Sequence, residues 1–246
     1  MISAVLITLN EQKNIRKALT SLKGLADEVI IADSGSRDNT LKIAREFNTE
    51  IYFRKFDNFA NQKNFALSKA TNEWVLALDA DEEIPSVLAE EIRKAVKNEQ
   101  YSGYLIPRRN FIFGTEIKYS RWSPDAHIWL WKKNSGKWVG DVHEEVKIAG
   151  KVGLLKSSKI HNSHQTLSSF FRANNLYSDL EAQSLYKKNI RFSFLKMFLT
   201  PIFEFILRFF YKRGFLDGKI GFALSFAMGI YKLSVWIKLW ELEKKK

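Results

Sequence analysis

Residues 74–83 read WVLALDADEE, five apolar residues that run directly into a cluster of carboxylates. A short apolar run without alternation is typical of a strand that is buried on both faces. A helical pattern follows over residues 85–97, with Pro85 near its first turn, where proline is favoured. The stretch therefore predicts a strand, an acidic turn and a helix in direct succession.

The chain before residue 74 repeats this order three times. The predicted strands are 3–9, 28–32 and 50–54, and the predicted helices are 14–22, 39–47 and 61–70. Short strands that alternate with helices predict an α/β fold, Rossmann-like, with a mostly parallel sheet and helices on both faces. Neither GxGxxG nor a P-loop motif follows the first strand, which disfavours a dinucleotide-dependent dehydrogenase and a P-loop nucleotidase.

Polar residues follow three of the four predicted strands. Thr8, Asn10 and Glu11 end the first, Asp33 ends the second, and Asp79 and Asp81 end the fourth. Because ligands of such sheets bind beyond the carboxyl ends of the strands, these clusters are expected along one rim. Two carboxylates spaced by one residue suit a hard cation, Mg²⁺ or Mn²⁺, which in turn binds a diphosphate. An acidic start to the next helix is the simpler alternative, and three clusters on one rim favour the metal.

Asp33 and Lys63 each allow a functional and a structural role. Asp33 is suited to a hydrogen bond with a nucleobase or ribose, or it starts a turn with Ser34 and Gly35. Lys63 would neutralise phosphate, or it is a solvated charge on its helix. Both are candidates for the nucleotide side of the site.

Three segments resemble the inverting glycosyltransferases of family 2, which have the GT-A fold. They read SAVLITLNEQKNIRKALTSL at 3–22, DEVIIADSGSRDNT at 27–40 and FANQKNFALSKATNEWVLALDADEE at 59–83. Their order and spacing look most similar to bacterial lipopolysaccharide inner-core β-1,4-glucosyltransferases, and the resemblance covers residues 2–150 well. By that resemblance, the nucleoside of a nucleotide-sugar would be contacted by Thr8, Asn10, Glu11 and Asp33. Asp79 would lie near the ribose, and Asp81 would bind the metal.

One departure from that family concerns the segment after Trp122-Ser123-Pro124-Asp125. Relatives commonly carry an arginine, a leucine and an aromatic residue there, whereas this chain has Trp129, Leu130 and Trp131. The replacement of the arginine by Trp129 leaves the identity of the sugars open.

Residues 101–150 are expected to form the acceptor side of the site. Four tryptophans, at positions 122, 129, 131 and 138, fall within seventeen positions. Indole rings stack on the apolar faces of sugars, although core packing in an antiparallel extension is the alternative. Most of the four are expected in the core, and the acceptor candidates are Trp122 and Trp138, together with Arg109.

The segment WVGDVHEEV at 138–146 carries the candidate catalytic base. An inverting transfer needs a group that removes the proton of the acceptor hydroxyl as it attacks the anomeric carbon. Related enzymes carry an acidic motif well after the metal aspartate, and Glu144 matches it, with Asp141 and Glu145 as alternatives. In a regular strand Glu144 would face away from His143 and Glu145, so the three would not all serve one site.

The run His161-Asn162-Ser163-His164 holds another candidate ligand. By resemblance to some GT-A enzymes, His161 would bind the metal or a phosphate, and a surface loop histidine is the alternative. HExxH and cysteine are both absent from the chain, so the spacing does not indicate a zinc site.

The 246 residues carry a formal charge of +12, which is unevenly placed. Residues 187–246 hold 13 Lys or Arg and 4 Asp or Glu, a net charge of +9. Aromatic and aliphatic residues are dense in the same quarter, and this combination indicates an anionic membrane surface more than nucleic acid. The chain has no cysteine, which excludes a disulfide scaffold, and its first residues do not predict a signal peptide.

Two apolar segments, 192–212 and 220–240, fill that last quarter. Polar residues recur at every fourth position of the first and would form a stripe on a helix; they are Lys196, Thr200, Glu204, Arg208 and Lys212. Pro201 would kink this helix or begin a second one. The longest apolar run, 220–231, is shorter than the roughly twenty residues that a spanning helix needs. Helices that lie in the membrane face, joined by a turn at 213–218, are therefore expected, with packing on each other or on a partner as the alternative.

These features predict an inverting hexosyltransferase that moves a hexose, glucose by resemblance, from a UDP-sugar to a lipid-anchored saccharide such as lipopolysaccharide core. A catalytic domain is expected over 1–165, with nucleotide-sugar binding in 1–100 and the acceptor and base segment in 101–165. A helical, basic, membrane-associating region is expected over 166–246. The predicted location is the cytoplasmic face of the inner membrane, held peripherally.

Three alternatives remain open. A polyprenyl-phosphate glycosyltransferase would place cations such as Arg108, Arg109 and Arg121 around a phosphate acceptor. A non-catalytic membrane adaptor would keep a nucleotide-sugar-binding fold without needing the Asp79-Ala80-Asp81 geometry. A basic nucleic-acid binder would bind DNA or RNA in a salt-sensitive manner without metal, and the charge placement disfavours it.

Overall fold

The computed structural model describes residues 1–140 and 144–244, and the chain divides into two compact units. The first unit comprises Met1–Arg109 and Ala126–Ser163, and the second comprises Asn110–Asp125 and His164–Lys246. Each unit has its own hydrophobic core. The polypeptide therefore leaves the first unit at residue 110, returns at residue 126 and leaves again at residue 164.

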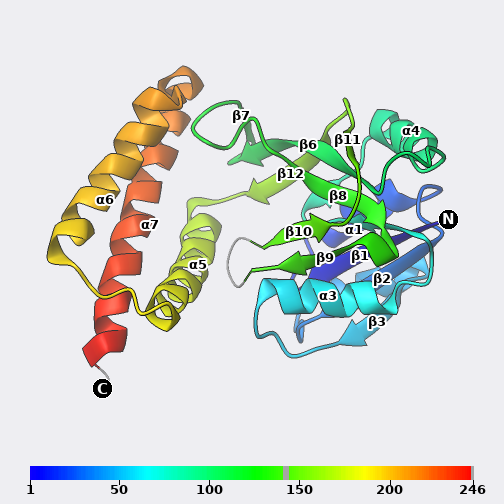
Figure 1. The fold of residues 1–246 in the computed structure, drawn as a ribbon, viewed down its shortest axis with the longest axis horizontal. Helices are drawn as coiled ribbons and strands as arrows, with labels where there is room; N and C mark the ends of the chain where they lie inside the picture. The colour runs from blue at the N-terminus through cyan, green and yellow to red at the C-terminus, as the bar shows by residue number, and fades with distance from the viewer. Residues whose placement is uncertain (141–143, 245–246) are drawn as a thin grey trace. The chain divides into compact units, whose positions relative to one another are not determined.

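The first unit begins with the predicted alternation of strands and helices (Figure 1). In order, its elements are β1 (Ile2–Thr8), α1 (Ile15–Leu22), β2 (Glu28–Asp33), α2 (Thr40–Ala44), β3 (Glu50–Phe53), α3 (Phe59–Lys69), β4 (Trp74–Ala77), β5 (Glu82–Glu83) and α4 (Ser86–Ala95). The predicted helix at 39–47 is divided into α2 and a 3-10 turn, Arg45–Phe47. The short strand β5 inside the acidic cluster is the one element here that the sequence patterns did not predict.

Most of the remaining strands extend the sheet through antiparallel pairs, whereas β11 pairs with β6 in the parallel sense. They are β6 (Gly103–Ile112), β7 (Thr115–Ile117), β8 (Ala126–Lys132), β9 (Gly136–Val139), β10 (Glu145–Ile148), β11 (Val152–Leu154) and β12 (Lys159–His164). The main sheet has the order β3-β2-β1-β4-β8-β6-β12-β5. The first four of these strands are parallel, while β8 is antiparallel to both β4 and β6. Strands β9 and β10 form a separate antiparallel ribbon. The predicted α/β fold class is confirmed.

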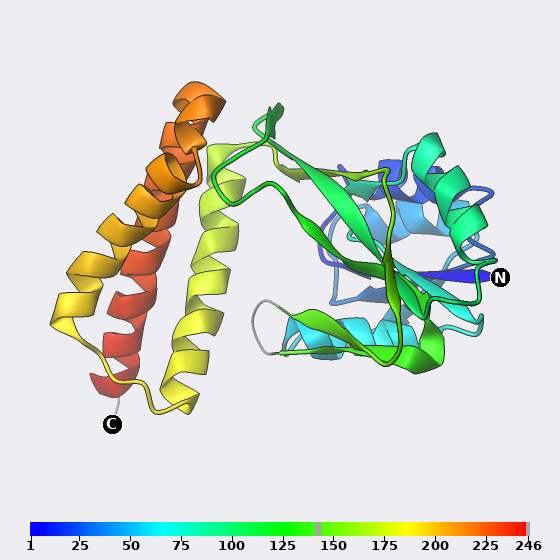
Figure 2. The same ribbon diagram turned by 45° about the horizontal axis from the view of Figure 1, so that its top comes forward.

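Strand β4 lies between β1 and β8 and is buried over its whole length. This burial explains its continuous apolar sequence, because a strand with neighbours on both edges and side chains covered on both faces has no water-facing position. Helix α3 packs against β1 and β2, as both ribbon views show (Figure 2). Since β1, β2 and β4 run parallel, their carboxyl ends lie along one edge of the sheet and carry Thr8, Asp33 and Asp79 to the same rim.

The second unit contains three long helices, α5 (Leu167–Lys187), α6 (Phe194–Ile206) and α7 (Gly218–Lys244). Helix α7 packs along both α5 and α6. A π-helical turn, Leu207–Tyr211, and a 3-10 turn, Gly214–Asp217, connect α6 to α7 near the predicted turn. Helix α6 runs through Pro201 and does not end there. A proline in mid-helix costs one backbone hydrogen bond, and packing of α6 along α7 supplies the compensating contacts.

Helix α7 is longer and more continuous than its interrupted apolar sequence indicates. Among the described residues, the stretch Gly214–Lys244 is the one helical stretch whose length and composition would allow it to cross a membrane. Less than half of its most apolar window, 44%, is buried inside the protein. The helix also places Lys232 against Glu181 and Lys238 against Asp179 of α5, at 2.7 and 2.8 Å.

Candidate active site

The carboxyl ends of β1 and β2 are joined by hydrogen bonds around Asp33. Thr8 Oγ1 donates to Asp33 Oδ2 at 2.9 Å, and the two residues are partners in the strand register. Asp33 Oδ1 accepts the N–H groups of Gly35 and Ser36, both at 2.8 Å. Asp33 is 2% exposed, so this chain's own donors occupy its carboxylate and shape the loop after β2. The turn-forming role considered for Asp33 is therefore present, and its contact with a nucleoside stays a prediction.

The loop after β1 is fastened to the loop after β2. Asn10 has a left-handed backbone conformation, φ 58°, which asparagine tolerates better than most residues. Its Oδ1 accepts the N–H of Arg37 at 2.8 Å, and its own N–H donates to Ser36 Oγ at 2.9 Å. The N–H of Glu11 donates to Thr40 Oγ1 at 2.7 Å. These bonds hold one side of the rim in a defined shape.

Glu11 lies in a negatively charged part of this rim. The pKa of Glu11 is raised to about 7, chiefly by burial and also by the charges of Asp81, Asp38 and Asp79, while the hydrogen bond from Asn14 opposes this shift. A carboxyl group that resists ionisation beside other carboxylates marks a place where added positive charge is favourable. The arrangement suits a cation-dependent ligand.

Lys63 joins two of the predicted site residues. Its Nζ lies 3.3 Å from Asp79 Oδ1 and 2.9 Å from Glu144 Oε1, and Lys63 is 8% exposed. Burial alone would lower the pKa of Lys63, but the charges of Asp79 and Glu144 outweigh it and raise that pKa. Burial likewise opposes ionisation of Asp79, and the charge of Lys63 more than compensates, so the pKa of Asp79 is lowered. The ammonium thus holds the candidate base beside the carboxyl end of β4.

Asp81 faces a histidine from a distant part of the chain. His161 Nε2 lies 3.3 Å from Asp81 Oδ2, and the N–H of Asn162 donates to the carbonyl oxygen of Asp81 at 2.9 Å. Burial disfavours the charged imidazole, but the charge and hydrogen bond of Asp81 prevail, so the pKa of His161 is raised. A carboxylate oxygen and an imidazole nitrogen at this separation suit two ligand positions of one divalent ion, of the kind that Mn²⁺ accepts. Within residues 1–140 and 144–244, no three or more His, Asp or Glu side chains are grouped so that they could hold a metal ion.

Glu82 organises the turn that carries the two aspartates. Its Oε2 accepts the N–H of Asp79 at 2.9 Å, and its own N–H donates back to the carbonyl oxygen of Asp79 at 3.0 Å. Lys159 Nζ donates to Glu82 Oε2 at 2.5 Å, and Arg108 Nη1 lies 3.3 Å from Glu82 Oε1. Lys159 also stands 3.3 Å from the centre of the Trp129 ring. Glu82 and Lys159 are both fully buried, so the turn rests on an internal ion pair.

Sequence patterns did not single out Glu82, Lys159 or Arg108 for this role. Burial lowers the pKa of Lys159 to about 8, although Glu82 acts in the opposite direction. One signal was available: Lys159 and His161 are two residues apart in β12, so they share a face of the strand. A histidine placed at the acidic turn therefore implies a lysine placed there too.

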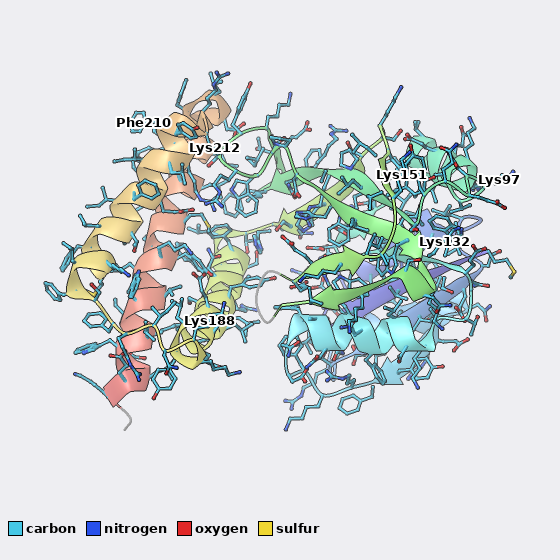
Figure 3. The ribbon with its side chains drawn as sticks, viewed as in Figure 1. Lys97, Lys132, Lys151, Lys188, Phe210 and Lys212 are labelled. Atoms are coloured by element: carbon cyan, nitrogen blue, oxygen red, sulfur yellow. The ribbon has the colours of Figure 1, made fainter. Side chains whose placement is uncertain are left out.

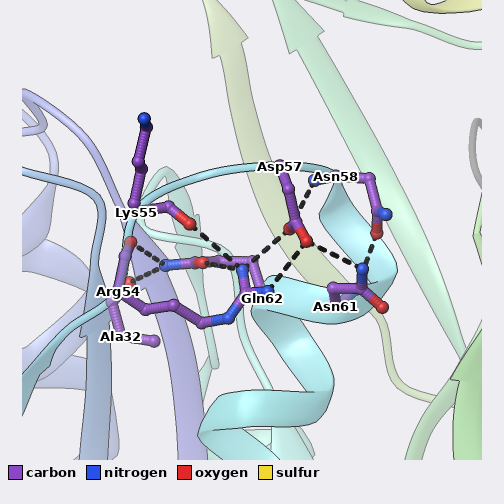
Figure 4. A network of polar contacts seen from close by, with 7 residues as sticks. All are labelled: Ala32, Arg54, Lys55, Asp57, Asn58, Asn61 and Gln62. Carbon is purple, nitrogen blue, oxygen red and sulfur yellow. Dashed lines mark hydrogen bonds and ion pairs between the residues drawn. The ribbon is translucent and has the colours of Figure 1, made fainter.

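A polar network anchors the start of α3, the helix that carries Lys63 (Figure 4). Arg54 forms two hydrogen bonds with the carboxylate of Asp57, at 2.8 and 2.9 Å. The fully buried Gln62 accepts from Arg54 Nη1 at 2.9 Å and donates to the carbonyl oxygen of Ala32 at 3.2 Å. Asn58 caps the helix by accepting the N–H of residue 61 at 2.8 Å. The network ties α3 to the end of β2.

The acceptor candidates lie in different places. Trp138 is 3% exposed, packs edge-on against Trp131 and lines a small pocket beside Lys63 and Asp79. Arg109 is exposed at the end of the first unit, whereas Trp122 belongs to the second unit, where its carbonyl oxygen accepts from Asn110 at 2.7 Å.

The two alternative candidates for the catalytic base are Glu145 and Asp141. Glu145 is exposed and is the first residue of β10, opposite Val139. Asp141 lies outside the described residues. Glu144 precedes the strand, so the facing rule for a regular strand does not apply to it.

Comparison with known proteins identifies relatives along the whole chain. The family described as glycosyl transferase family 2 matches residues 3–174. An uncharacterized glycosyltransferase of Rickettsia felis is 30% identical over 237 residues, which cover 91% of this chain and 84% of the relative. The lipopolysaccharide core biosynthesis glycosyltransferase LpsC of Rhizobium meliloti is 26% identical over 250 residues, which cover 98% of this chain and 92% of that protein.

Solved structures share the fold at low sequence identity. The mannosyltransferase PcManGT from Pyrobaculum calidifontis, in complex with GDP-Man and Mn²⁺, has a TM-score of 0.55 at 15% identity, covering 97% of this chain and 86% of that chain. TarS of S. aureus, residues 1–349 in complex with UDP, has a TM-score of 0.50 at 15% identity, covering 100% of this chain and 92% of that chain. The sheet order, the rim of polar residues and the match over most of the chain agree: this protein has the GT-A fold and belongs to glycosyl transferase family 2.

Proposed function

We propose that this glycosyltransferase is an inverting, metal-dependent hexosyltransferase that moves a hexose, glucose by resemblance, from a UDP-sugar to a lipid-anchored saccharide such as lipopolysaccharide core. Its place of action is the cytoplasmic face of the inner membrane, where it is held peripherally. The observation that carries the proposal is the contact of Lys63 with both Asp79 and Glu144. That contact brings a candidate base to the carboxyl end of β4, on the rim where sheets of this kind bind their ligands.

The roles of the residues follow from their positions. Glu144 receives the proton of the acceptor hydroxyl, and its ion pair with Lys63 orients the carboxylate. Thr8, Asn10, Glu11 and Asp33 shape the nucleoside side of the rim. Asp79 lies between them and the base.

Asp81 and His161 are the residues that would hold Mg²⁺ or Mn²⁺. When bound, the ion offsets the charge that develops on the departing nucleoside diphosphate. Mg²⁺ sites of this type take one or two protein carboxylates and complete their shell with substrate phosphates and water, which agrees with the small number of protein ligands. Relatives support the choice of donor and ion, because solved neighbours bind UDP or Mn²⁺.

The polyprenyl-phosphate alternative receives less support. It required Arg108, Arg109 and Arg121 around a phosphate, but Arg108 lies 3.3 Å from Glu82 and Arg121 lies 3.5 Å from Glu204. Two of the three cations are thus engaged by this chain's own carboxylates. Relatedness to LpsC supports a saccharide acceptor.

Turnover of UDP-glucose with membrane extract, with and without Mn²⁺ or Mg²⁺, tests the proposal. Glu144→Gln is expected to lower kcat by about 10²–10⁴-fold, with little change in UDP affinity, because a general base contributes that much. Asp81→Ala is expected to abolish the metal response. The matched control is Glu145→Gln, which replaces the exposed neighbour of the base.

Each outcome has a defined reading. Normal turnover in Glu144→Gln together with loss in Glu145→Gln would move the base to Glu145. Full, metal-stimulated activity in Asp81→Ala would overturn the metal assignment. UDP-glucose binding without any transfer would favour the non-catalytic adaptor, and a product that is a polyprenyl phosphate sugar would favour the alternative acceptor.

A further inference from the structure

Helix α6 and the π-helical turn that follows it bury two charged side chains, Glu204 and Arg208, while many apolar side chains of α6 are exposed. Glu204 and Arg208 are 6% and 9% exposed, and Arg208 Nε donates to Glu204 Oε1 at 2.5 Å. The exposed apolar side chains of α6 have exposed fractions from 48% to 67%; they are Phe194, Leu195, Phe198, Leu199, Ile202, Phe203 and Ile206. A helix that faces water shows the opposite arrangement. A contiguous exposed apolar face of this kind marks an interaction surface.

The exposed face continues across the end where α6 and α7 are connected. Phe209 contacts the rings of Phe205, Phe210 and Phe222, with centroids 5.5, 5.0 and 5.5 Å away. Phe222 in turn stacks on Phe226 at 6.4 Å. Phe210, Phe222 and Phe226 are each at least half exposed. We call these five residues the aromatic cluster.

Exposed cations surround the same end of the helical hairpin. Figure 3 labels Phe210 and Lys212 at this end and Lys188 at the opposite end of the unit. The basic tip, as we define it, consists of the exposed residues Lys118, Lys212, Arg213 and Lys219; the neighbouring Arg121 lies 3.5 Å from Glu204 and is not counted. Lys212 and Arg213 follow the π-helical turn, Lys219 lies in the first turn of α7, and Lys118 comes from the segment 118–122.

The segment 118–122 is held to the hairpin by its backbone. Asp217 accepts the N–H groups of Lys118 and Tyr119, both at 3.0 Å. The N–H of Ser120 donates to the carbonyl oxygen of Lys212 at 3.0 Å. These three hydrogen bonds hold the segment 118–122 against residues 212–217. Lys118 and Lys212 therefore belong to one continuous surface.

The connection itself is closely packed. Arg208 Nη1 donates to the carbonyl oxygen of Ser120 at 2.9 Å. A Cβ atom at Gly221 would lie 1.8 Å from the carbonyl oxygen of Gly214, so the first turn of α7 approaches the preceding turn more closely than any other residue allows. The basic tip is therefore a shaped surface and not a loose loop.

We infer that the aromatic cluster and the basic tip together dock on an anionic phospholipid bilayer. The phenylalanines enter the boundary between headgroups and acyl chains, and the lysines and Arg213 meet the lipid phosphates. The inference deepens the proposed function, on which it rests for the lipid-anchored acceptor, by naming the surface that meets the lipid. It also brings the segment with Arg121 and Trp122 to the headgroup level.

Charge argues for lipid over the other occupants of such a face. Two copies of this chain pairing through the tip would bring four cations against four, which is unfavourable. A membrane-spanning α7 would carry into hydrocarbon the ion pairs of Lys232 with Glu181 and of Lys238 with Asp179. An anionic surface satisfies both the cations and the exposed rings.

Binding of the full chain to vesicles of phosphatidylcholine, alone or mixed with phosphatidylglycerol, tests this inference. The wild-type chain is expected to bind the mixed vesicles and to bind pure phosphatidylcholine weakly. Lys212→Gln with Arg213→Gln is expected to weaken binding to mixed vesicles about thirty-fold, from the contribution of two cations at an anionic surface. Phe210→Gln with Phe222→Gln is expected to weaken binding to both kinds of vesicle. The control, Lys187→Gln with Lys188→Gln, removes the same charge at the opposite end of the unit.

The outcomes separate this inference from the proposed function. Equal loss of binding in the tip variant and in the control would overturn the basic tip as the docking surface. No vesicle binding by a wild-type chain that still turns over UDP-glucose would overturn the inference and leave the transfer reaction standing. Bound protein that resists carbonate extraction would show a spanning helix, and a dimer broken by Phe210→Gln without vesicle binding would show a second copy as the occupant. Either result would contradict the inference.

Discussion

Lys63 and Lys159 are buried ammonium groups with different partners. Lys63 lies between Asp79 and Glu144, so two carboxylates share one cation. Lys159 faces Glu82 and the Trp129 ring, and burial lowers its pKa to about 8. The two lysines also bracket the turn of Asp79 and Asp81 from α3 and from β12. Each lysine therefore supports the acidic turn through the carboxylate that it pairs with, and its removal is expected to disturb that turn.

Replacement of Lys159 tests the support of that turn. Lys159→Met is expected to cost about 1.5–3 kcal/mol of unfolding free energy, because the buried carboxylate of Glu82 would lose its shorter ion pair and keep only Arg108, at 3.3 Å. Adding Glu82→Gln is expected to restore most of the loss, since the buried charge disappears while an acceptor for the Asp79 N–H remains. Urea unfolding of the two variants and the wild type measures both effects. A cost below about 1 kcal/mol for the single variant would contradict the importance of the pair.

Glu11 predicts a pH-dependent contribution to stability. Its pKa is about 7 in the folded protein and 4.5 without the fold, so the folded state binds the extra proton between these values. Stability from this group is therefore highest at low pH and falls as the pH rises towards 7. Relative to the wild type, Glu11→Gln is expected to gain on the order of 1–2 kcal/mol at pH 8 and almost nothing at pH 4.

Urea unfolding at the two pH values, in the presence of EDTA, gives that comparison. Glu99→Gln, an exposed carboxyl far along the chain, serves as the control for a general charge effect. An equal gain at both pH values would show that the substitution acts through something other than the titration of Glu11.

At the scale of elements, α3 is positioned by polar contacts as well as by its buried apolar residues. The helix buries Gln62 and Lys63 among its contacts, and neither residue is apolar. Gln62 bridges Arg54 and the carbonyl oxygen of Ala32, which fastens the helix to the strand that ends at Asp33. These hydrogen bonds fix the position of α3 relative to β2, and the position of the helix brings Lys63 to Asp79 and Glu144.

Removal of Gln62 therefore tests how α3 is held. Gln62→Ala is expected to cost about 1–3 kcal/mol, because the buried carbonyl of Ala32 loses a donor and Arg54 loses an acceptor. It is also expected to lower kcat, since Lys63 and Glu144 lose their alignment. Thermal unfolding and UDP-glucose turnover measure the two effects. Asn64→Ala, which removes two hydrogen bonds between the same helix and the backbone of Trp138, separates a local effect from general loosening.

At the scale of the whole molecule, the second unit is completed by a segment from the middle of the chain. Ile112 and Ile117, both within residues 110–125, are buried with Phe170, Leu224 and Ala227. A domain boundary at residue 165 would assign residues 110–125 to the first unit, although they pack in the second. The division of the chain in space is therefore discontinuous in sequence.

Truncation shows the consequence of this arrangement. A chain that ends after Gln165 is expected to be poorly soluble and to bind a dye for exposed apolar surface, because Ile112 and Ile117 lose their partners. A chain that ends after Glu243 keeps every buried residue of the second unit and is the control, in the same mild detergent. Size-exclusion chromatography makes the comparison. A monomeric, folded 1–165 chain would contradict the prediction.

Local patterns predict much of the fold and part of the site. The alternation of apolar runs and helical periods up to residue 97 predicts β1 to β4 and α1 to α4, because each strand is buried as a unit and each helix has one apolar face. The same reasoning places Thr8, Asp33 and Asp79 on one rim, since parallel strands end together. These features depend on neighbours in sequence or on topology alone.

Tertiary structure decides the features that join distant segments. No local pattern relates Glu82 to Lys159, 77 positions away, or Lys63 to Glu144. The polar stripe of α6 is visible in the sequence, but only packing shows that Glu204 and Arg208 face inward while the phenylalanines face outward. The sequence by itself thus determined the order of elements and the rim, through periodicity and burial. Which side chains meet, and which face of a helix is left uncovered, depends on contacts between segments far apart along the chain.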